Sequence, residues 1–573
     1  MANATRDPVA TYLPGVDLAR SYERRWLRPD LIAGLTVGAM LVPQAMAYAN
    51  LAGLPPVSGL YAAVLPMFVY AVLGSSRQLM VGPESTTAIM TAAAVAPLAA
   101  GDPARYAVLA AAAAVIVGVL CFGAGLLRLG FLADVFSLPT LVGYLTGVGF
   151  LMIGGQLEEL SGVAVEGDSF VAQAWSFLTN LDQIDWTTFV LGLGTLAFLI
   201  VLRLRFPRAP GALIAILVST AIAVVLGLEG EGIILVGDIP SGFTGLSLPD
   251  VDLDVVVDLF PAAAAIAIIA YTDNILTARS FAAKGGYRVD DNQELIALGA
   301  VNVTSGLSQG FPISSSGSRT AVGDGVGSRT QAAGAFAALV VIVILLFFRP
   351  VLENFPEAAL AAIIIDAGLR LIDVAAFRRL ARYRRSEAAL AVLTTVGVLT
   401  FGLLTGVVIA VVLSLLVALG RAATPNTAVL GTVPGVDGYH NVERHPSAQT
   451  VPGLIVYRWD APLFFLNATY FRRRARDLVT SADEPVHWVL IDAEAITDID
   501  STGIQSLSQL CDFMEDAEVT LAFSRLRSRE RLRLGEAGLE GRIGSEHFFA
   551  TTRTGVDAYL EERSGRDGTG DAG

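Results

Sequence analysis

The chain is short of charged residues, cysteine and histidine, and each shortage excludes a class of protein. Only 16% of its 573 residues are charged, against about 25% in soluble globular proteins. Its two cysteines, Cys121 and Cys511, are too few and too far apart for a disulfide framework. All four histidines lie after residue 420, so the preceding sequence has no imidazole for a metal centre or a proton relay.

The sequence also lacks the marks of a nucleic-acid-binding protein and of a secreted one. Its net charge is −14, whereas nucleic acid is bound by a concentrated basic surface. It contains no nucleotide-binding motif. Several arginines and no apolar run precede Leu31, which argues against a cleavable signal peptide. We therefore expect the first apolar segment to remain as a membrane span.

Hydrophobic residues, in contrast, are abundant. They make up 54% of the chain, and the mean hydropathy is +0.60, as expected of a protein that lies largely in lipid. Apolar runs predict twelve membrane elements, at 30–51, 57–73, 104–127, 139–157, 187–204, 211–228, 257–280, 294–308, 332–348, 358–372, 386–402 and 404–420. Half-helices after Pro83 and Pro312 bring the predicted number to fourteen.

The placement of arginine orients these elements. Arginines gather in or near the connections at 20–28, 203–208, 279–288 and 370–385. Such clusters mark the cytoplasmic side of a membrane protein. We expect a multi-pass protein of the inner (plasma) membrane, with its N-terminus and its C-terminal domain in the cytoplasm.

Two polar segments interrupted by glycine and proline, 81–87 and 310–320, stand inside the apolar sequence. If the fourteen elements are divided into two sets of seven, each segment begins the third element of its set. This correspondence is typical of an inverted repeat. A helix that begins inside the membrane presents free N–H groups and a partial positive charge, so the ligand predicted between the segments is an anion.

The composition becomes more polar after residue 420. Apolar runs at 454–457 and 486–491 predict strands, and 467–479 and 503–512 predict amphipathic helices. This alternation indicates a small α/β domain. The predicted division is a cytoplasmic N-terminal segment at 1–29, a transmembrane transport domain at 30–420, a linker at 421–450, the α/β domain at 451–563 and a disordered tail at 564–573.

Several motifs occur together in a characteristic order. They are GLTVGAMLVPQAMAYA from Gly34, LAGLPPVSGLY from Leu51, Gly82-Pro83, YTDN from Tyr271, NQEL from Asn292 and the run from Phe311 to Thr320. Together they resemble the SulP family of anion transporters, whose animal members are the solute carrier 26 proteins, and most closely its actinobacterial sulfate transporters. The run from Asp498 to Gly503 is similar to a loop of the STAS domain.

The resemblance implies an architecture. The membrane part is then all-α, with fourteen transmembrane elements in two inverted seven-span repeats that divide into a core and a gate. A cytoplasmic α/β STAS domain follows, and the protein is a homodimer. The half-helices after Pro83 and Pro312 point their N-termini at one central anion site.

The predicted anion site combines hydroxyl groups, main-chain N–H groups and one fixed charge. Arg319 supplies the charge one turn into the second half-helix. Gln44 and Tyr48 share a helix face just after Pro43, and the resemblance places them in the anion pocket. The predicted substrate contacts are Gln44, Tyr48, Glu84, Ser85, Thr86, Ser315, Ser316, Gly317, Ser318 and Arg319. In the alternative interpretation the serines only cap helices, Arg319 pairs with an acid, and Gln44 and Tyr48 only pack.

Asp273 and Thr277 lie four residues apart in an apolar run, so they share a helix face. A carboxylate in hydrocarbon is costly unless it is paired, protonated or bound to a cation, which predicts an ion-coupling role. The resemblance implies a sodium site at these positions in the bicarbonate-transporting branch, where a threonine stands in place of Gly317. That departure favours H⁺ over Na⁺ as the coupling ion. We expect no other cofactor and no metal.

Glu84 is the second predicted proton carrier. A negative charge beside an anion pocket repels the substrate unless it is protonated or neutralised. Glu84 is expected either to bind a proton together with the anion or to pair with Arg319 in the empty site. In the alternative interpretation it only stabilises a helix N-terminus.

The STAS loop holds a candidate regulatory residue. Thr502 stands where soluble STAS proteins carry a phosphorylated serine, so the resemblance indicates regulation there and a cytoplasmic partner of the STAS domain.

The sequence thus predicts a secondary active transporter and not an enzyme. Its substrate is an inorganic anion, sulfate first, carried by proton symport through alternating access, and its partners are that anion, membrane lipid and a second copy. The alternatives are transport of bicarbonate or a C4-dicarboxylate on the same fold, a STAS-based regulatory membrane scaffold, and an uncoupled anion channel.

Overall fold

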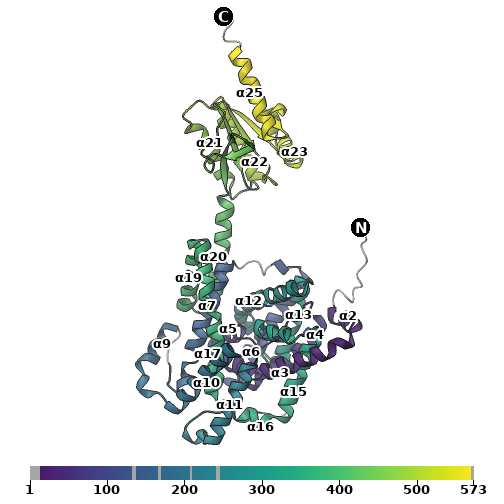
Figure 1. Ribbon diagram of the computed structural model, residues 1–573, viewed down its shortest axis with the longest axis vertical. Coiled ribbons are helices and arrows are strands. Elements are labelled where there is room, and N and C mark those ends of the chain that lie inside the picture. Colours follow the sequence, from purple (N-terminus) through teal and green to yellow (C-terminus); the bar gives the residue numbers. More distant parts are fainter. Residues whose placement is uncertain (1–12, 132–136, 166–169, 207–208, 240–244, 569–573) are drawn as a thin grey trace. The chain divides into compact units, whose positions relative to one another are not determined.

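The structure is a computed structural model, which describes residues 13–131, 137–165, 170–206, 209–239 and 245–568. It divides into a helical unit that ends at Ser414 and a second unit that begins at Leu415 (Figure 1). The first 12 residues of the expected N-terminal segment lie outside the described part. The rest of that segment forms the short helix α2 (Pro14–Arg20) and the start of α3.

The helical unit has a helix in each of the twelve apolar ranges. These helices are α3 (Arg24–Leu51), α4 (Val57–Leu73), α6 (Pro103–Leu126), α7 (Leu138–Gly154), α10 (Trp186–Arg205), α11 (Gly211–Leu226), α12 (Leu253–Gly285), α13 (Asp291–Leu307), α15 (Ala332–Phe347), α17 (Glu357–Leu371), α19 (Arg385–Phe401) and α20 (Leu403–Ala423). Among the described helices, α3, α6, α10, α12 and α20 are long and apolar enough to cross a membrane by themselves. Helices α3 and α12 extend beyond the predicted ranges because hydropathy detects the apolar part of a helix and not its polar ends.

The connections contain short helices that the hydropathy pattern does not predict. They are α8 (Leu157–Ser161), α9 (Phe170–Thr179), α16 (Arg349–Glu353) and α18 (Val374–Tyr383). Large apolar side chains on the apolar helices remain exposed, among them Leu204 (75%) on α10, Val225 (81%) on α11 and Phe347 (73%) on α15. Such exposure is expected of helix faces that contact lipid.

Two half-helices complete the helical unit. The helix α5 (Ser85–Ala99) follows the strand β1 (Val81–Gly82), and α14 (Gly317–Gly325) follows β2 (Ser314–Ser315). Helix α3 packs on α14 and α15, while α12 packs on α5 and α6. In the order of the two sets of seven, α3 corresponds to α12, α5 to α14 and α6 to α15. The contacts of α3 with α14 and α15 therefore correspond to those of α12 with α5 and α6. The strands β1 and β2 pair antiparallel, so the packing follows the predicted inverted repeat.

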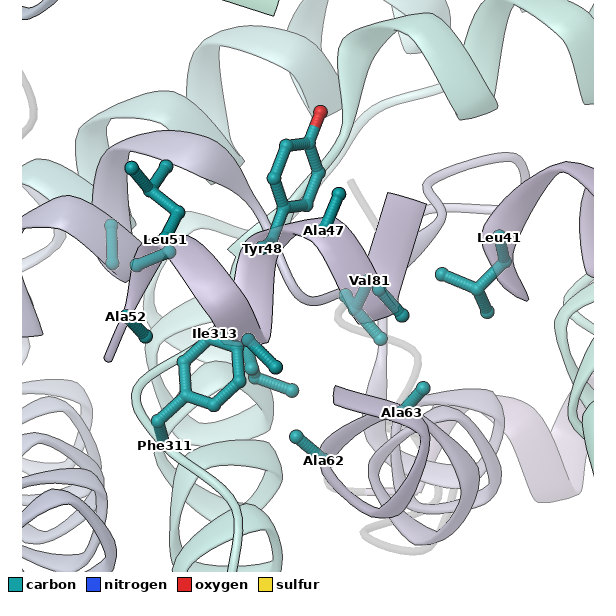
Figure 2. Packing of buried hydrophobic residues seen from close by; sticks show 14 of the residues in the cluster. Leu41, Ala47, Tyr48, Leu51, Ala52, Ala62, Ala63, Val81, Phe311 and Ile313 are labelled. Atoms are coloured by element: carbon teal, nitrogen blue, oxygen red, sulfur yellow. The ribbon is translucent and has the colours of Figure 1, made fainter. Parts of the chain in front are cut away.

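Small residues let the segment before β2 pass close to its neighbours. A Cβ on Gly310 would lie 2.6 Å from that of Ala62 in α4. Figure 2 shows Phe311 and Ile313 packed near Ala52, which follows α3, and near Ala62. Since these side chains are buried together, the segment is fixed immediately before the polar site.

The second unit is an α/β domain. Its six-stranded sheet has the order β4 (Val436–Asn441), β3 (Thr427–Val433), β5 (Leu454–Trp459), β6 (Trp488–Asp492), β7 (Thr520–Ser524) and β8 (Phe548–Phe549). Neighbours from β5 to β8 are parallel, and β3 is antiparallel to both β4 and β5. The helices are α21 (Ala468–Thr480), α22 (Ser501–Asp516), α23 (Ser528–Glu536), α24 (Leu539–Ile543) and α25 (Thr552–Gly568). Alternate residues of β6 enter separate cores, Val489 on the face with α21 and α22 and Leu490 on the face with α25.

Two predicted boundaries of this domain are wrong. The pattern predicts a linker over 421–450, whereas β3 and β4 lie there and β3 pairs with β5. β3 alternates buried and partly exposed residues, with Ala428 and Leu430 in the core, and β4 is an edge strand that pairs with β3. The glycine, proline and polar neighbours of β3 hid this strand signal in the sequence. The tail predicted from 564 is helical as far as Gly568. Near its end, Tyr559 and Arg563 donate hydrogen bonds to the carbonyl of Pro452.

Candidate functional site

The two polar segments lie side by side. Val81 is opposite Ser315 and Gly82 is opposite Ser314. The N–H of Ser316 donates to the carbonyl of Met80 over 2.9 Å. Since α5 and α14 begin within three residues of these strands, the pairing brings the first turns of both half-helices to one place.

Gly82 is required at this position. Its φ of +145° lies in a region that residues with a Cβ rarely adopt. An added Cβ would also lie 3.4 Å from Nη2 of Arg319. The main chain of β1 therefore runs directly along the guanidinium group.

Arg319 is the central charge of the site. Its side chain is 0% exposed. Nη1 donates to Oε1 of Gln44 over 3.4 Å, while Nε and Nη2 have no hydrogen-bond partner among the described residues. The expected ion pair with Glu84 is not formed in this structure. Glu84 and Asp273 act on this guanidinium electrostatically without a hydrogen bond to it. A buried cation with such incomplete compensation is costly, and a bound anion would reduce that cost.

The serines before Arg319 have different roles. The Ser316 hydroxyl accepts from the N–H of Arg319 over 3.4 Å and so caps α14, as the structural alternative predicts. The Ser315 hydroxyl donates to Oδ2 of Asp273 over 3.5 Å. Gly317 and Ser318 are exposed although their neighbours are buried. These two residues are therefore accessible to a ligand.

The start of α5 already holds an anion of the protein itself. The Glu84 carboxylate accepts from the N–H of Thr86 over 2.7 Å and from the Ser85 hydroxyl over 2.6 Å. These are the donors that the sequence assigns to the substrate. They can bind a ligand only if their hydrogen bonds to Glu84 are broken.

Asp273, Thr277 and Gly317 come together as the shared helix face predicts. Asp273 on α12 accepts weak hydrogen bonds from Ser314 (3.4 Å) and Ser315 (3.5 Å). The residue is exposed, and Glu84 and Arg319 act electrostatically on its carboxyl group. A Cβ on Gly317 would lie 3.9 Å from Oγ1 of Thr277. Asp273 is therefore an accessible acid among the polar residues at the start of α14.

Helix α3 contributes two nearly buried side chains, Gln44 (2% exposed) and Tyr48 (6% exposed). Gln44 orients Arg319 through the hydrogen bond described above. The Tyr48 hydroxyl points away from Phe311 and Ile313 (Figure 2).

Sequence reasoning missed Tyr144 on α7. Its hydroxyl is buried without a partner among the described residues and interacts electrostatically with Glu84. The sequence feature that could have indicated this residue is a tyrosine within a glycine-rich apolar run.

Thr502 lies in the first turn of α22, far along the sequence from these residues. Asp500 caps this helix by accepting from the N–H of Gly503 over 2.7 Å. Thr502 is half-buried, whereas Ser501 is exposed. A hydrogen bond from Arg533 lowers the pKa of Asp498 from its ordinary value, so an ion pair already stands four residues before Thr502.

Comparison with known proteins identifies the family. The sulfate permease family model matches residues 27–394, and the STAS domain model matches residues 445–555. The chain belongs to the sulfate permease family. One relative in sequence is a probable sulfate transporter of Mycobacterium tuberculosis. It is 48% identical over 550 residues, which cover 96% of this chain and 98% of the relative. The chloroplastic sulfate transporter 4.1 of Arabidopsis thaliana is 33% identical over 97% of this chain and 83% of the relative.

Solved structures confirm the membrane helical fold with its C-terminal STAS domain. Murine solute carrier 26 family member A9, an anion transporter in the inward-facing state, superposes with a TM-score of 0.87 at 25% identity, covering 97% of this chain and 95% of that one. The transmembrane domain of the cyanobacterial bicarbonate transporter BicA has a TM-score of 0.61 at 24% identity, covering 69% of this chain and 98% of that one. That second likeness concerns the fold alone.

Proposed function

We propose that this family member is a secondary active transporter of inorganic anions, with sulfate as its first substrate and H⁺ as its coupling ion. The observation that carries this proposal is Arg319, a buried guanidinium whose Nε and Nη2 have no partner among the described residues. Two relatives named as sulfate transporters support the choice of anion.

The substrate oxyanion binds at the start of α14. Arg319 supplies the fixed charge, and exposed Gly317 and Ser318 supply an N–H group and a hydroxyl. Gln44 holds the guanidinium in place. Tyr48 and Ser316 complete the wall of this pocket.

The position of Glu84 supports the proposed proton coupling. When ionised, its carboxylate occupies the N–H of Thr86 and the hydroxyl of Ser85. A proton on Glu84 weakens that hold and frees both donors for the substrate. Proton and anion then bind more tightly together than alone, which is the thermodynamic condition for symport. Asp273, with Thr277 beside it, is the second proton site.

The remaining features of the transporter are also proposals. Transport proceeds by alternating access, as the core moves against the gate. The protein is a homodimer of the inner membrane, with its N-terminus and STAS domain in the cytoplasm. Thr502 regulates transport through a cytoplasmic partner.

The test is uptake of radiolabelled sulfate into proteoliposomes with imposed H⁺ and Na⁺ gradients, and with bicarbonate and fumarate as competitors. Saturable sulfate uptake that an inward proton gradient accelerates supports the proposal. Stimulation by a sodium gradient would show that Na⁺ and not H⁺ is the coupling ion. Preference for bicarbonate or fumarate would show that the competitor and not sulfate is the main substrate. A current that follows voltage without saturating would identify a channel, and absence of all transport would favour the scaffold.

A further inference from the structure

A cavity of about 270 Å³ lies beside the site, between α3, α10, α11, α14 and α17. Gln44 and Ser318, two residues of the proposed anion site, form part of its wall. One water molecule needs about 15 Å³ of such space, so the cavity can hold an oxyanion with some of its water. Arg319 itself is not part of the wall, but Gln44, which accepts its hydrogen bond, and Ser318, its neighbour in the chain, are.

Two arginines and one acid share this cavity. Arg203 on α10 donates from Nη1 to Oδ1 of Asp366 over 2.5 Å. Arg370, one turn after Asp366 on α17, approaches Oδ2 of the same carboxylate at 3.4 Å. Asp366 is nearly buried at 7% side-chain exposure, whereas both arginine side chains are 37% exposed. The cluster of these three residues carries a net positive charge that faces open space.

The geometry of the cluster leaves capacity for an anion. A carboxylate can balance one guanidinium, and Arg203 makes the shorter contact with it. Arg370 makes the longer contact, so its interaction with Asp366 is the weaker of the two. A second anion in the cavity can therefore take the guanidinium of Arg370 while Asp366 keeps Arg203 in place.

We propose that Arg203, Asp366 and Arg370 form a second anion-binding site, which receives the inorganic oxyanion on its way between the cytoplasm and Arg319. This inference rests on the proposed function, because its ligand is the transported anion. It adds a site on α10 and α17, whereas the central site is built on α3, α5, α12 and α14.

Asp366 keeps this second site weak. A site on a transport path must attract the ion but must also release it. With Asp366 ionised, the anion has to compete for the arginines, so it passes on and does not remain bound. Removal of Asp366 strengthens binding there, and removal of either arginine weakens it.

The experiment compares sulfate uptake by right-side-out and inside-out membrane vesicles that contain the full chain. Arg370→Gln is expected to raise the KM from the cytoplasmic side about three- to tenfold and to change the KM from the other side less than about twofold. Asp366→Asn is expected to lower the cytoplasmic KM and to reduce the maximal rate, since release becomes slower. Arg205→Gln is the matched control, because Arg205 is exposed two residues beyond Arg203.

Opposite changes of the cytoplasmic KM in Arg370→Gln and Asp366→Asn indicate a binding role of the cluster. Damage to the packing of α10 on α17 would instead change the KM of both variants in the same direction. Equal changes on both sides, changes of the same sign, or no effect of Arg370→Gln would overturn the inference while the proposed function stands. If the wild type carries bicarbonate and not sulfate, the proposed substrate fails, and the same comparison with bicarbonate decides the inference. If the wild type carries no anion, both fail.

Discussion

The first turns of α5 and α14 occupy equivalent places in the two halves of the helical unit, yet their charges are opposite. Both follow a short strand, and the two strands pair with each other. At α5 the N–H of Thr86 is held by Glu84, a carboxylate of the chain itself. At α14 a serine caps the helix, and Arg319 has no hydrogen bond to an acid among the described residues. The backbone is thus repeated, while the first turn of one half-helix holds an acid and that of the other holds a guanidinium.

The largest effect is expected at the α14 side of this comparison. Arg319→Gln removes the fixed charge and is expected to weaken sulfate binding about tenfold to a hundredfold, the range for a lost hydrogen bond to a charged group. Equilibrium binding of radiolabelled sulfate to the purified protein measures this. Arg105→Gln, at an exposed arginine at the start of α6, is the control. Unchanged sulfate binding by Arg319→Gln would show that the anion does not bind at the start of α14.

A smaller effect is expected at the α5 side. Glu84→Gln imitates the protonated carboxyl at every pH, so the KM for sulfate at alkaline pH should fall about three- to fivefold. The acceleration of uptake by acidic pH should shrink accordingly. Uptake measured across a pH series tests both statements, with Asp273→Asn as the companion variant. A pH profile identical to the wild type would assign Glu84 to helix capping alone.

The paired strands allow the two halves to be compared directly, since Gly82 is opposite Ser314. Gly82→Ala introduces backbone strain and should lower the free energy of unfolding by about 1–3 kcal/mol. Ser314→Ala removes the 2.9 Å hydrogen bond to the Ala270 carbonyl and should cost about 1 kcal/mol. Thermal unfolding in detergent ranks the two. A larger loss in Ser314→Ala would show that β1 tolerates a side chain.

The smallest effect on stability is expected at Gly317. An added Cβ meets Oγ1 of Thr277 at 3.9 Å, an ordinary contact, so Gly317→Thr should change the free energy of unfolding by less than about 0.5 kcal/mol. The new hydroxyl stands beside Thr277 and Asp273, and sulfate uptake should become stimulated by Na⁺. Uptake with and without a sodium gradient measures the gain, and Gly317→Ala is the matched control. Equal uptake in both conditions would show that the hydroxyl does not decide the coupling ion.

Much of the fold could be predicted from local signals. The ranges of α4 and α15 follow from apolar runs, because a helix in lipid must bury its main-chain polar groups within itself. Pro83 and Pro312 each precede a half-helix, because proline interrupts a regular element. Helix α5 begins two residues after Pro83, whereas β2 separates Pro312 from the start of α14 at Gly317. The short strands β1 and β2 carry no pattern that shows their pairing, since it joins residues more than 230 positions apart.

The sequence by itself determined the family, the membrane helices, the two half-helices and the residue types around them, because these depend on periodicity, proline and motifs that are local in the chain. Tertiary structure decided which of those residues are already engaged. It placed Glu84 on the donors of α5, left Nε and Nη2 of Arg319 without a hydrogen bond among the described residues, and brought Arg203 to Asp366 across 163 positions of sequence. Such contacts depend on how separate helices pack, so no local pattern records them.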